Sequence, residues 1–345
     1  MAVEMDQSIK PAQTPVKKRV FSGVQPTGNI HIGNYLGAIR NWVNDQQNYD
    51  NIYCIVDLHA LTVLPIDPKE LHMNTRKLAA LYLACGLDTR YCKLFVQSHV
   101  RQHAEASWIM ECFAPVGWMQ RMTQFKVKAA ELHADSISTG LLCYPALMAC
   151  DILLYQTHYV PVGDDQRQHL EFTRDLAQRF NSMYGQEVFT IPEPQIRAVG
   201  ARIMALDDPT KKMSKSDPFD FSRINLLDDP KTIKKKIARA TTDSERLVKF
   251  DDERPGITNL LTIYQTLTGQ TQEVIEAEFE GKGYGDFKAA LTDQIVAVLE
   301  PIQRRYHELI NDLPTLEAIL KQGADEARPM AEVTLQRIKD VVGLG

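Results

Sequence analysis

The stretch FSGVQPTGNIHIGN, from Phe21 to Asn34, joins an apolar strand to a glycine-rich turn that runs into a helix. Backbone N–H groups at the start of that helix face whatever lies beyond the strand, and the helix dipole adds partial positive charge. His31 would lie at the helix start, where an imidazole can donate a hydrogen bond to a phosphate, and Gly33 leaves room for a ligand. The stretch predicts an anion site, although His31 alone is equally typical of a surface helix cap.

A second stretch, KKMSKS at residues 211–216, places lysines among small hydroxyls and one methionine. This composition is typical of a mobile loop that closes over a polyphosphate and neutralises charge that develops during phosphoryl chemistry. A solvated loop is the alternative interpretation. The residues of the loop that could contact a nucleotide are Lys212, Met213, Ser214, Lys215 and Ser216.

One carboxylate interrupts an apolar segment at residues 141–155, LLCYPALMACDILLY. Pro145 suits the first helical position, and Tyr144, Met148, Asp151 and Tyr155 then recur at helical spacing on one face. A charge removed from water destabilises the fold by several kcal/mol unless it is paired, so we expect Asp151 to have a partner. A structural ion pair, or a helix turned toward solvent, is the alternative to a ligand site.

Strand-like and helical runs alternate through the first 200 residues. Strands are expected at residues 20–24, 51–56, 93–97 and 159–162, and helices at 33–46, 68–85 and 168–180. This alternation predicts a parallel sheet wound by helices, with ligands beyond the carboxyl ends of the strands. VPVGDDQ, at residues 160–166, falls at such an end, where Asp164 or Asp165 could also simply cap the next helix.

After residue 216 the pattern changes to polar helices without a convincing strand. We expect helices at residues 231–240, 256–267, 271–280, 284–310, 313–322 and 325–342. The predicted organisation is a flexible tail at residues 1–16, an α/β catalytic domain at 17–216 and an all-helical domain at 217–345.

Composition narrows the class of protein. The net charge of −5 disfavours generic nucleic-acid binding, so RNA contacts would have to come from local patches, and no apolar run is long enough to span a membrane.

The six cysteines lack a Cys-x-x-Cys pair, which favours reduced thiols and a cytoplasmic location. His99 and His103 could hold a metal only with a third ligand that is not evident. The basic run from Lys231 to Arg239 is either a solvated helix face or an RNA contact.

The glycine-rich stretch at residues 21–34 and the lysine stretch at residues 211–216, in this order, resemble the HIGH and KMSKS signatures of class I aminoacyl-tRNA synthetases. The sequence between them narrows the resemblance to the bacterial tryptophanyl-tRNA synthetase family, and this resemblance extends from Arg19 to Gly345. Asn34 stands where the last histidine of the HIGH motif would be. The resemblance implies a Rossmann-like, doubly wound catalytic domain and a helical region that binds the tRNA anticodon.

The resemblance also assigns site residues. In nucleotide binding, Gly163 would allow close approach, Asp165 would hold the ribose and Ile203 would flank adenine. In the amino-acid site, Asp151 would accept the indole N–H, because that group only donates and a carboxylate only accepts. Gln166 and Tyr144 would hold the substrate ammonium group. The implied catalytic residues are His31, Asn34, Lys212, Lys215 and Lys128; further ATP contacts are Gln25, Pro26, Thr27, Gly33 and Asp164; further tryptophan contacts are Met148, Phe21 and Gly23.

The implied reaction joins L-tryptophan to tRNA(Trp) through tryptophanyl-adenylate, with Mg²⁺ arriving on ATP and no dedicated protein metal site. The family implies a cytoplasmic homodimer with neither a membrane nor DNA as a partner. Two alternatives stay open. A tyrosyl-tRNA synthetase shares the architecture but would need groups that bind a phenol, and a silent paralogue would bind tRNA or tryptophan without forming an adenylate.

Overall fold

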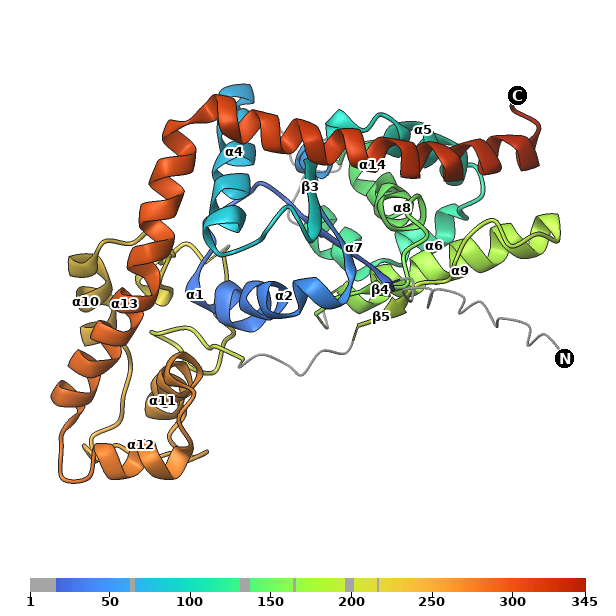
Figure 1. The fold of residues 1–345 in the computed structure, drawn as a ribbon. Coiled ribbons are helices and arrows are strands. Elements are labelled where there is room, and N and C mark those ends of the chain that lie inside the picture. The colour runs from blue at the N-terminus through green and yellow to red at the C-terminus, as the bar shows by residue number, and fades with distance from the viewer. Residues whose placement is uncertain (1–16, 63–65, 131–136, 164–165, 196–201, 216) are drawn as a thin grey trace, which may run out of the picture.

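A five-stranded parallel sheet lies at the centre of the molecule (Figure 1). The computed structural model describes residues 17–62, 66–130, 137–163, 166–195, 202–215 and 217–345. The strands are β1 (Arg19–Val24), β2 (Asp50–Ile55), β3 (Cys92–Val96), β4 (Tyr159–Val160) and β5 (Glu193–Pro194), in the order β3-β2-β1-β4-β5. The four predicted strands are confirmed. The short edge strand β5 was not predicted, because two residues that include a proline carry no alternating pattern.

Strand order reverses its direction at β1, which pairs with β2 on one side and with β4 on the other. In a parallel sheet this reversal opens a crevice beyond the carboxyl ends of the two strands concerned. The glycine-rich turn follows β1 and Gly163 follows β4, so both lead out of the sheet at this crevice. The doubly wound, Rossmann-like architecture is therefore confirmed.

Helices cover both faces of the sheet. Their bounds are α1 (Ile32–Asn34), α2 (Arg40–Asp45), α3 (Asp57–Ala60), α4 (Pro68–Ala84), α5 (Gln102–Glu111), α6 (Val116–Gln120), α7 (Thr123–Ala130), α8 (Thr139–Leu153), α9 (Arg167–Tyr184), α10 (Pro230–Arg239), α11 (Pro255–Thr268), α12 (Gln272–Glu278), α13 (Tyr284–Asn311) and α14 (Leu313–Val342). A π-helical turn (Tyr35–Ile39) joins α1 to α2, and short 3₁₀ turns lie at Gln46–Asn48, Gln97–His99 and Asp220–Ser222. Within the described ranges, no helix is long and apolar enough to cross a membrane.

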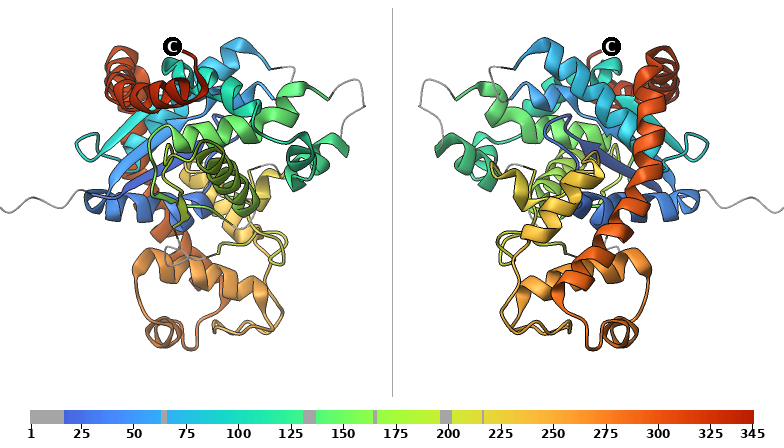
Figure 2. Two further views of the ribbon diagram at one scale, coloured as in Figure 1. Left: turned by 90° about the vertical axis from the view of Figure 1, so that its right-hand side faces the viewer. Right: turned by 90° about the vertical axis from the view of Figure 1, so that its left-hand side faces the viewer.

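Alternating side chains of the central strands supply two hydrophobic cores. Tyr53 and Ile55 of β2 belong to one core, and Ile52 and Cys54 belong to the other. This is the period of two that a strand imposes, with both faces of the sheet buried. The first core continues into α11 and α13, which gather with α12 at one end of the molecule (Figure 2).

The predicted break between two C-terminal helices is wrong, because α14 is one continuous helix across Gly323. Glycine is needed there for packing, since an added Cβ would lie 2.1 Å from the carbonyl oxygen of Leu94 in β3. The helix then follows the sheet toward the C-terminus (Figure 1), where Ala327 and Leu335 join the second core. The domain boundary at residue 216 stays a prediction. Helix α14 comes after this boundary in the chain, but it packs against β3 of the sheet.

The expected start of the helix that carries Asp151 is also wrong. Helix α8 begins at Thr139, with the Ser138 hydroxyl accepting the Leu141 N–H at 3.2 Å, and Pro145 lies inside it. The sequence signal for this start was the N-cap serine rather than the proline. The helix ends at Leu153, so Tyr155 lies just beyond it.

Candidate active site

His31 lies at the helix start, as the sequence predicts, and its side chain is only 2% exposed. The side-chain carbonyl of Asn34 accepts the His31 backbone N–H at 3.2 Å, which closes the first turn. Among the described residues, Nδ1 of His31 has no hydrogen-bond partner. A Cβ added to Gly33 would lie 3.0 Å from this nitrogen and 3.5 Å from Cβ of Ile203. Glycine therefore keeps open the space between the imidazole and Ile203.

Burial, and then the charges of Lys215, Arg223 and Lys212, lower the pKa of His31 to about 3. The imidazole is consequently neutral at pH 7, and each ring nitrogen is either a donor or an acceptor. A neutral ring surrounded by cations suits an anionic ligand, because the ligand would compensate the positive charge that now disfavours protonation.

The lysine loop lies directly against the glycine-rich turn. Gly28 has a φ of +67°, and a Cβ added there would lie 3.4 Å from Cβ of Lys215. Burial lowers the pKa of Lys215 to about 8. Met213 is buried beside Ile203 in the first core, and its N–H donates to the Ile203 carbonyl at 3.1 Å. Two stretches separated by more than 170 residues therefore meet around one space.

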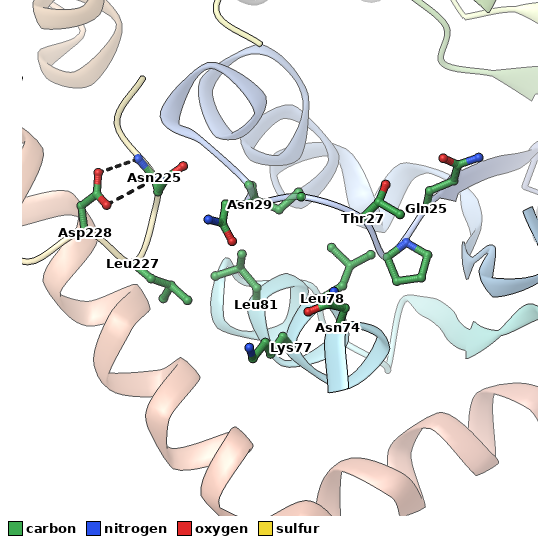
Figure 3. A pocket seen from close by; sticks show the side chains of 13 residues that line it. Gln25, Thr27, Asn29, Asn74, Lys77, Leu78, Leu81, Asn225, Leu227 and Asp228 are labelled. Carbon is green, nitrogen blue, oxygen red and sulfur yellow. Dashed lines mark hydrogen bonds between the residues drawn. The ribbon is translucent and has the colours of Figure 1, made fainter. Parts of the chain in front are cut away.

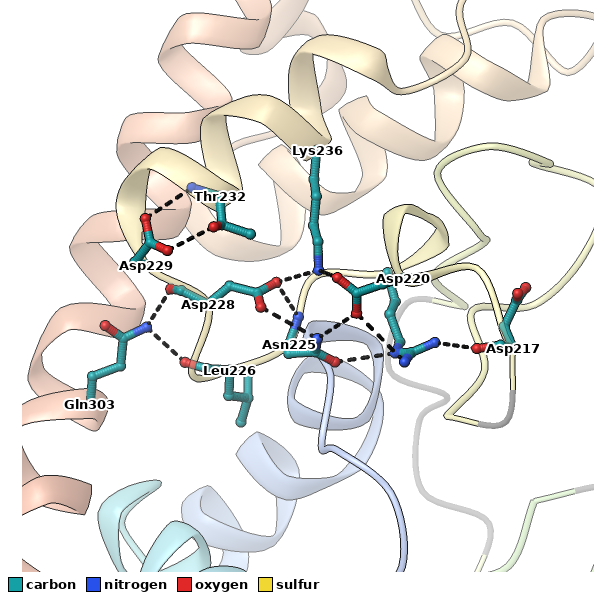
Figure 4. A network of polar contacts seen from close by, with 10 residues as sticks. Asp217, Asp220, Asn225, Leu226, Asp228, Asp229, Thr232, Lys236 and Gln303 are labelled. Carbon is teal, nitrogen blue, oxygen red and sulfur yellow. Dashed lines mark hydrogen bonds and ion pairs between the residues drawn. The ribbon is translucent and has the colours of Figure 1, made fainter.

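Residues 217–228 connect the lysine loop to the His31 turn. Asn225 forms an antiparallel bridge with His31, flanked by hydrogen bonds from Ile32 N–H to Ile224 and from Leu226 N–H to Ile30. Lys236 of α10 holds this segment at both ends: its Nζ lies 2.8 Å from Asp220 and 2.7 Å from Asp228 (Figure 4). Lys236 is 1% exposed, so it is not part of a solvated or RNA-facing run. No pattern in the sequence indicated this role for Lys236.

Asp151 is 1% exposed and is held by three side chains. Oδ1 accepts from Gln97 Nε2 at 2.6 Å and contacts His103 Nδ1 at 2.6 Å, and Oδ2 contacts His59 Nε2 at 2.8 Å. Burial alone would raise the pKa of Asp151, but the hydrogen bonds and charges of His103 and His59 lower it to about 2. Asp151 thus has the partners that its burial requires, and sequence reasoning identified none of them as such.

The other side chains that were predicted to contact the amino-acid substrate lie on helix α8 or close to it. Phe21 stacks on Tyr155 with ring centroids 5.8 Å apart. The Tyr144 hydroxyl lies 2.6 Å from Nε2 of His169, and burial raises the pKa of Tyr144 to about 12. Lys128 lies over the Tyr144 ring, 5.7 Å from its centroid. Met148 packs against the second core.

For several other predicted site residues, the structure shows only local packing or backbone contacts, or does not describe the residue. Gly23 lies where a Cβ would approach Val56 Cγ1 to 3.1 Å, and the Gln166 N–H donates to the Gly163 carbonyl at 3.0 Å. The predicted contacts of Asp164, Asp165 and Ser216 lie outside the described residues. His103 contacts Asp151, and no group of three or more histidine, cysteine or acidic residues in the described chain could hold a metal. All six cysteines are free thiols.

A pocket of about 210 Å³ lies beside the glycine-rich turn (Figure 3). Gln25, Pro26 and Thr27 form one wall, and Leu78 and Leu81 of α4 project toward them. Asn225 and Asp228 also line the pocket, so it touches the segment that Lys236 holds. Neither Gly33 nor Lys215 lines it.

Comparison with known proteins extends these observations. The family model of class I tRNA synthetases (W and Y) matches residues 14–300. The chain is 58% identical to a tryptophan–tRNA ligase of Wolinella succinogenes over 95% of this chain and 99% of that protein, and 54% identical to one of Bacillus subtilis over 96% and 99%.

Solved structures give the same result. A tryptophanyl-tRNA synthetase from Mycoplasma pneumoniae is similar with a TM-score of 0.86 and 40% identity, covering 96% of this chain and 99% of that one. A tryptophanyl-tRNA synthetase from Campylobacter jejuni, complexed with ADP and tryptophan, has a TM-score of 0.82 and 36% identity, covering 94% and 100%.

Proposed function

The chain belongs to the class I tRNA synthetases of the tryptophan and tyrosine type, and from this we propose that it is a tryptophan–tRNA ligase that uses ATP. The observation that carries the proposal is the buried carboxylate of Asp151 on an apolar helix, in a chain that is 52–58% identical to several tryptophan–tRNA ligases. An indole N–H only donates, and an ionised carboxylate only accepts.

In the first step a carboxylate oxygen of tryptophan attacks the α-phosphorus of ATP. The bond from that phosphorus to the bridging oxygen of the β-phosphate breaks, which yields tryptophanyl-adenylate and pyrophosphate. The attacking carboxylate is already ionised at neutral pH, so no general base is needed. Catalysis then rests on positioning and on stabilising phosphate charge, for which His31, Lys212 and Lys215 are the candidates.

In the second step a ribose hydroxyl of the terminal adenosine of tRNA(Trp) attacks the activated carbonyl, and AMP leaves. The neutral imidazole of His31 and the open space at Gly33 fit a nucleotide, with Ile203 beside the base. Gln25, Thr27 and Lys128 would contact ATP from the turn and from α7. Mg²⁺ would arrive on the phosphates and neutralise part of their charge.

The assembly is part of the proposal. The helical region from residue 217 would bind the tRNA anticodon, and the protein would act as a cytoplasmic homodimer. Support for a partner surface comes from α5 and α6, where Trp108 is 71% exposed and Val116 is 55% exposed. Such large apolar groups are enriched in protein interfaces.

The proposal is tested by aminoacylation. The full chain, with ATP and Mg²⁺, should transfer labelled tryptophan to a tRNA that carries the tryptophan anticodon. A tRNA with the tyrosine anticodon and labelled tyrosine serve as matched controls. Transfer of tyrosine would identify the other branch of the family, and adenylate formation without transfer would contradict the second step.

A further inference from the structure

Three side chains restrain Asp151 from three separate elements: His59 from α3, Gln97 from the turn after β3 and His103 from α5. A carboxylate offers about four acceptor positions, two on each oxygen. Oδ1 is contacted twice, by Gln97 and His103, and Oδ2 once, by His59. These contacts leave one acceptor position, on Oδ2.

The orientation of two of the three donors, Gln97 and His103, is fixed by a second contact. Gln97 accepts the Leu58 N–H on Oε1 at 3.1 Å, which directs its NH₂ group to Asp151. His103 contacts the Tyr155 hydroxyl through Nε2 at 2.8 Å. Because the carboxylate only accepts, Nδ1 of His103 carries a hydrogen and donates it to Oδ1.

Tyr155 is itself fixed. Its side chain is fully buried and stacks on Phe21 with an interplanar angle of 12°. The hydroxyl of Tyr155 therefore holds Nε2 of His103 in place, and this fixes the direction in which Nδ1 meets Oδ1 of Asp151. The contact between His103 and Tyr155 in this way sets the direction of the contact between His103 and Asp151.

We propose that His103, held by Tyr155, is a specificity-determining positioning residue that leaves Asp151 a single acceptor position for the N–H of an indole ring. This inference rests on the proposed function, since it assumes that tryptophan is the substrate. It assigns to His103 the selection of a ring N–H over an isosteric ring without one. His103 does not touch the substrate in this account and acts through Asp151.

The test compares tryptophan with its benzothiophene analogue, in which sulfur replaces the ring N–H. Selectivity is the ratio of the two kcat/KM values in ATP–pyrophosphate exchange. His103→Leu removes the donor and should lower selectivity at least about tenfold, through the KM for tryptophan, because a site built around a hydrogen bond discriminates strongly against a ligand without it. His103→Asn keeps a donor near Nδ1 and should retain selectivity within roughly threefold of wild type.

Two further variants separate positioning from general damage to the core. Tyr155→Phe keeps volume and removes the contact that orients the His103 ring, so selectivity should fall by roughly three- to tenfold. Tyr82→Phe removes another buried hydroxyl in the first core and should leave selectivity unchanged. If His103→Leu does not fold, Tyr155→Phe and His103→Asn still decide the matter.

The inference is overturned if His103→Leu, or Tyr155→Phe where His103→Leu does not fold, weakens both ligands equally, because selectivity then does not depend on this contact. That outcome leaves the proposed function intact. Failure of the wild-type protein to exchange with tryptophan at all would instead reject the proposed function.

Discussion

Lys215 is a half-buried cation next to the glycine-rich turn, and burial lowers its pKa to about 8. A charge placed in this way stabilises a developing phosphate charge more than a solvated lysine would, because the site needs little reorganisation during the reaction. The residue is therefore expected to act on the rate of adenylate formation rather than on amino-acid binding.

We expect Lys215→Ala to lower the rate of adenylate formation by at least about a hundredfold, which corresponds to roughly 2.7–4 kcal/mol of lost stabilisation. Single-turnover formation of adenylate measures this rate, and tryptophan affinity is measured in parallel. Lys211→Ala is a matched control, because Lys211 is exposed and paired with Asp208. An equal loss of tryptophan binding and of rate would place Lys215 in ground-state binding instead.

His31 should make the stability of the fold depend on pH. Its pKa is about 3 in the folded state, through burial and nearby cations, against about 6.5 for an unperturbed histidine. The unfolded chain therefore binds the proton first, and stability is lost as the pH falls from 6.5 toward 3. Replacing His31 by Gln should reduce the loss between pH 6.5 and 5 by roughly 1–2 kcal/mol. Urea unfolding at several pH values measures the free energy of unfolding of both proteins. The same dependence of this free energy on pH in both proteins would contradict the prediction.

At the scale of elements, the segment at residues 217–228 joins the lysine loop to the His31 turn and is fastened by Lys236. The side chain of Lys236 is fully buried, whereas Asp220 is more than half exposed and Asp228 largely buried. Loss of the lysine would leave mainly Asp228 without its charge partner. A buried charge without a partner destabilises a fold strongly.

We predict that Lys236→Met lowers the free energy of unfolding by roughly 1–3 kcal/mol. It should also raise the KM for ATP several-fold while the KM for tryptophan stays close to wild type, because Asp151 lies in a separate cluster. Lys235→Met is the control, since Lys235 is exposed on the same helix. Unchanged ATP kinetics in a destabilised Lys236→Met protein would show that the segment is only structural.

Helix α14 offers a test of packing. Gly323→Ala would place a methyl group against the backbone of β3, so it should destabilise the fold by roughly 1–3 kcal/mol, as overpacking does. Gly285→Ala in α13 meets no atom within 4 Å and should be neutral or slightly stabilising. Chemical denaturation compares the two, and equal stabilities would mean that α14 shifts freely on the sheet.

The local sequence pattern was enough to predict the helices and strands that have strong periodicity or clear capping residues. The strands with long apolar runs, the helix after the glycine-rich turn and the helix α9 were predicted close to their bounds. Gly323 was misread as a helix break, because a close approach to another strand is a tertiary contact. Pro145 was misread as a helix start, because the competing N-cap lay seven residues earlier.

The candidate site was predicted in outline for the same reason. Residues within the two signature stretches were recognisable from residue type and order. The partners of Asp151 come from three other elements, and Lys236 lies in a basic run that suggested a solvated face. Such contacts depend on how the elements pack, and no spacing in the sequence reports them.

On the scale of the whole molecule, two distant signatures meet at the crevice of a doubly wound sheet, and a helix with one buried carboxylate packs against the opposite face of the same sheet. Under the proposed function, one sheet would thus carry the nucleotide and amino-acid halves of the site. Helices α10 to α13 extend from it at one end of the molecule (Figure 2). This arrangement is what a two-step ligase requires, because both small substrates must meet before the RNA accepts the product.

The most direct test of this account is ATP–pyrophosphate exchange measured with each of the twenty amino acids in turn. Adenylate formation is reversible and needs no tRNA, so the measurement reports the site alone. The account predicts exchange with tryptophan at a kcat/KM at least about a hundredfold above that with tyrosine, because Asp151 and its partners present an acceptor to an indole N–H. Comparable exchange with tyrosine, or no exchange with tryptophan, would contradict it.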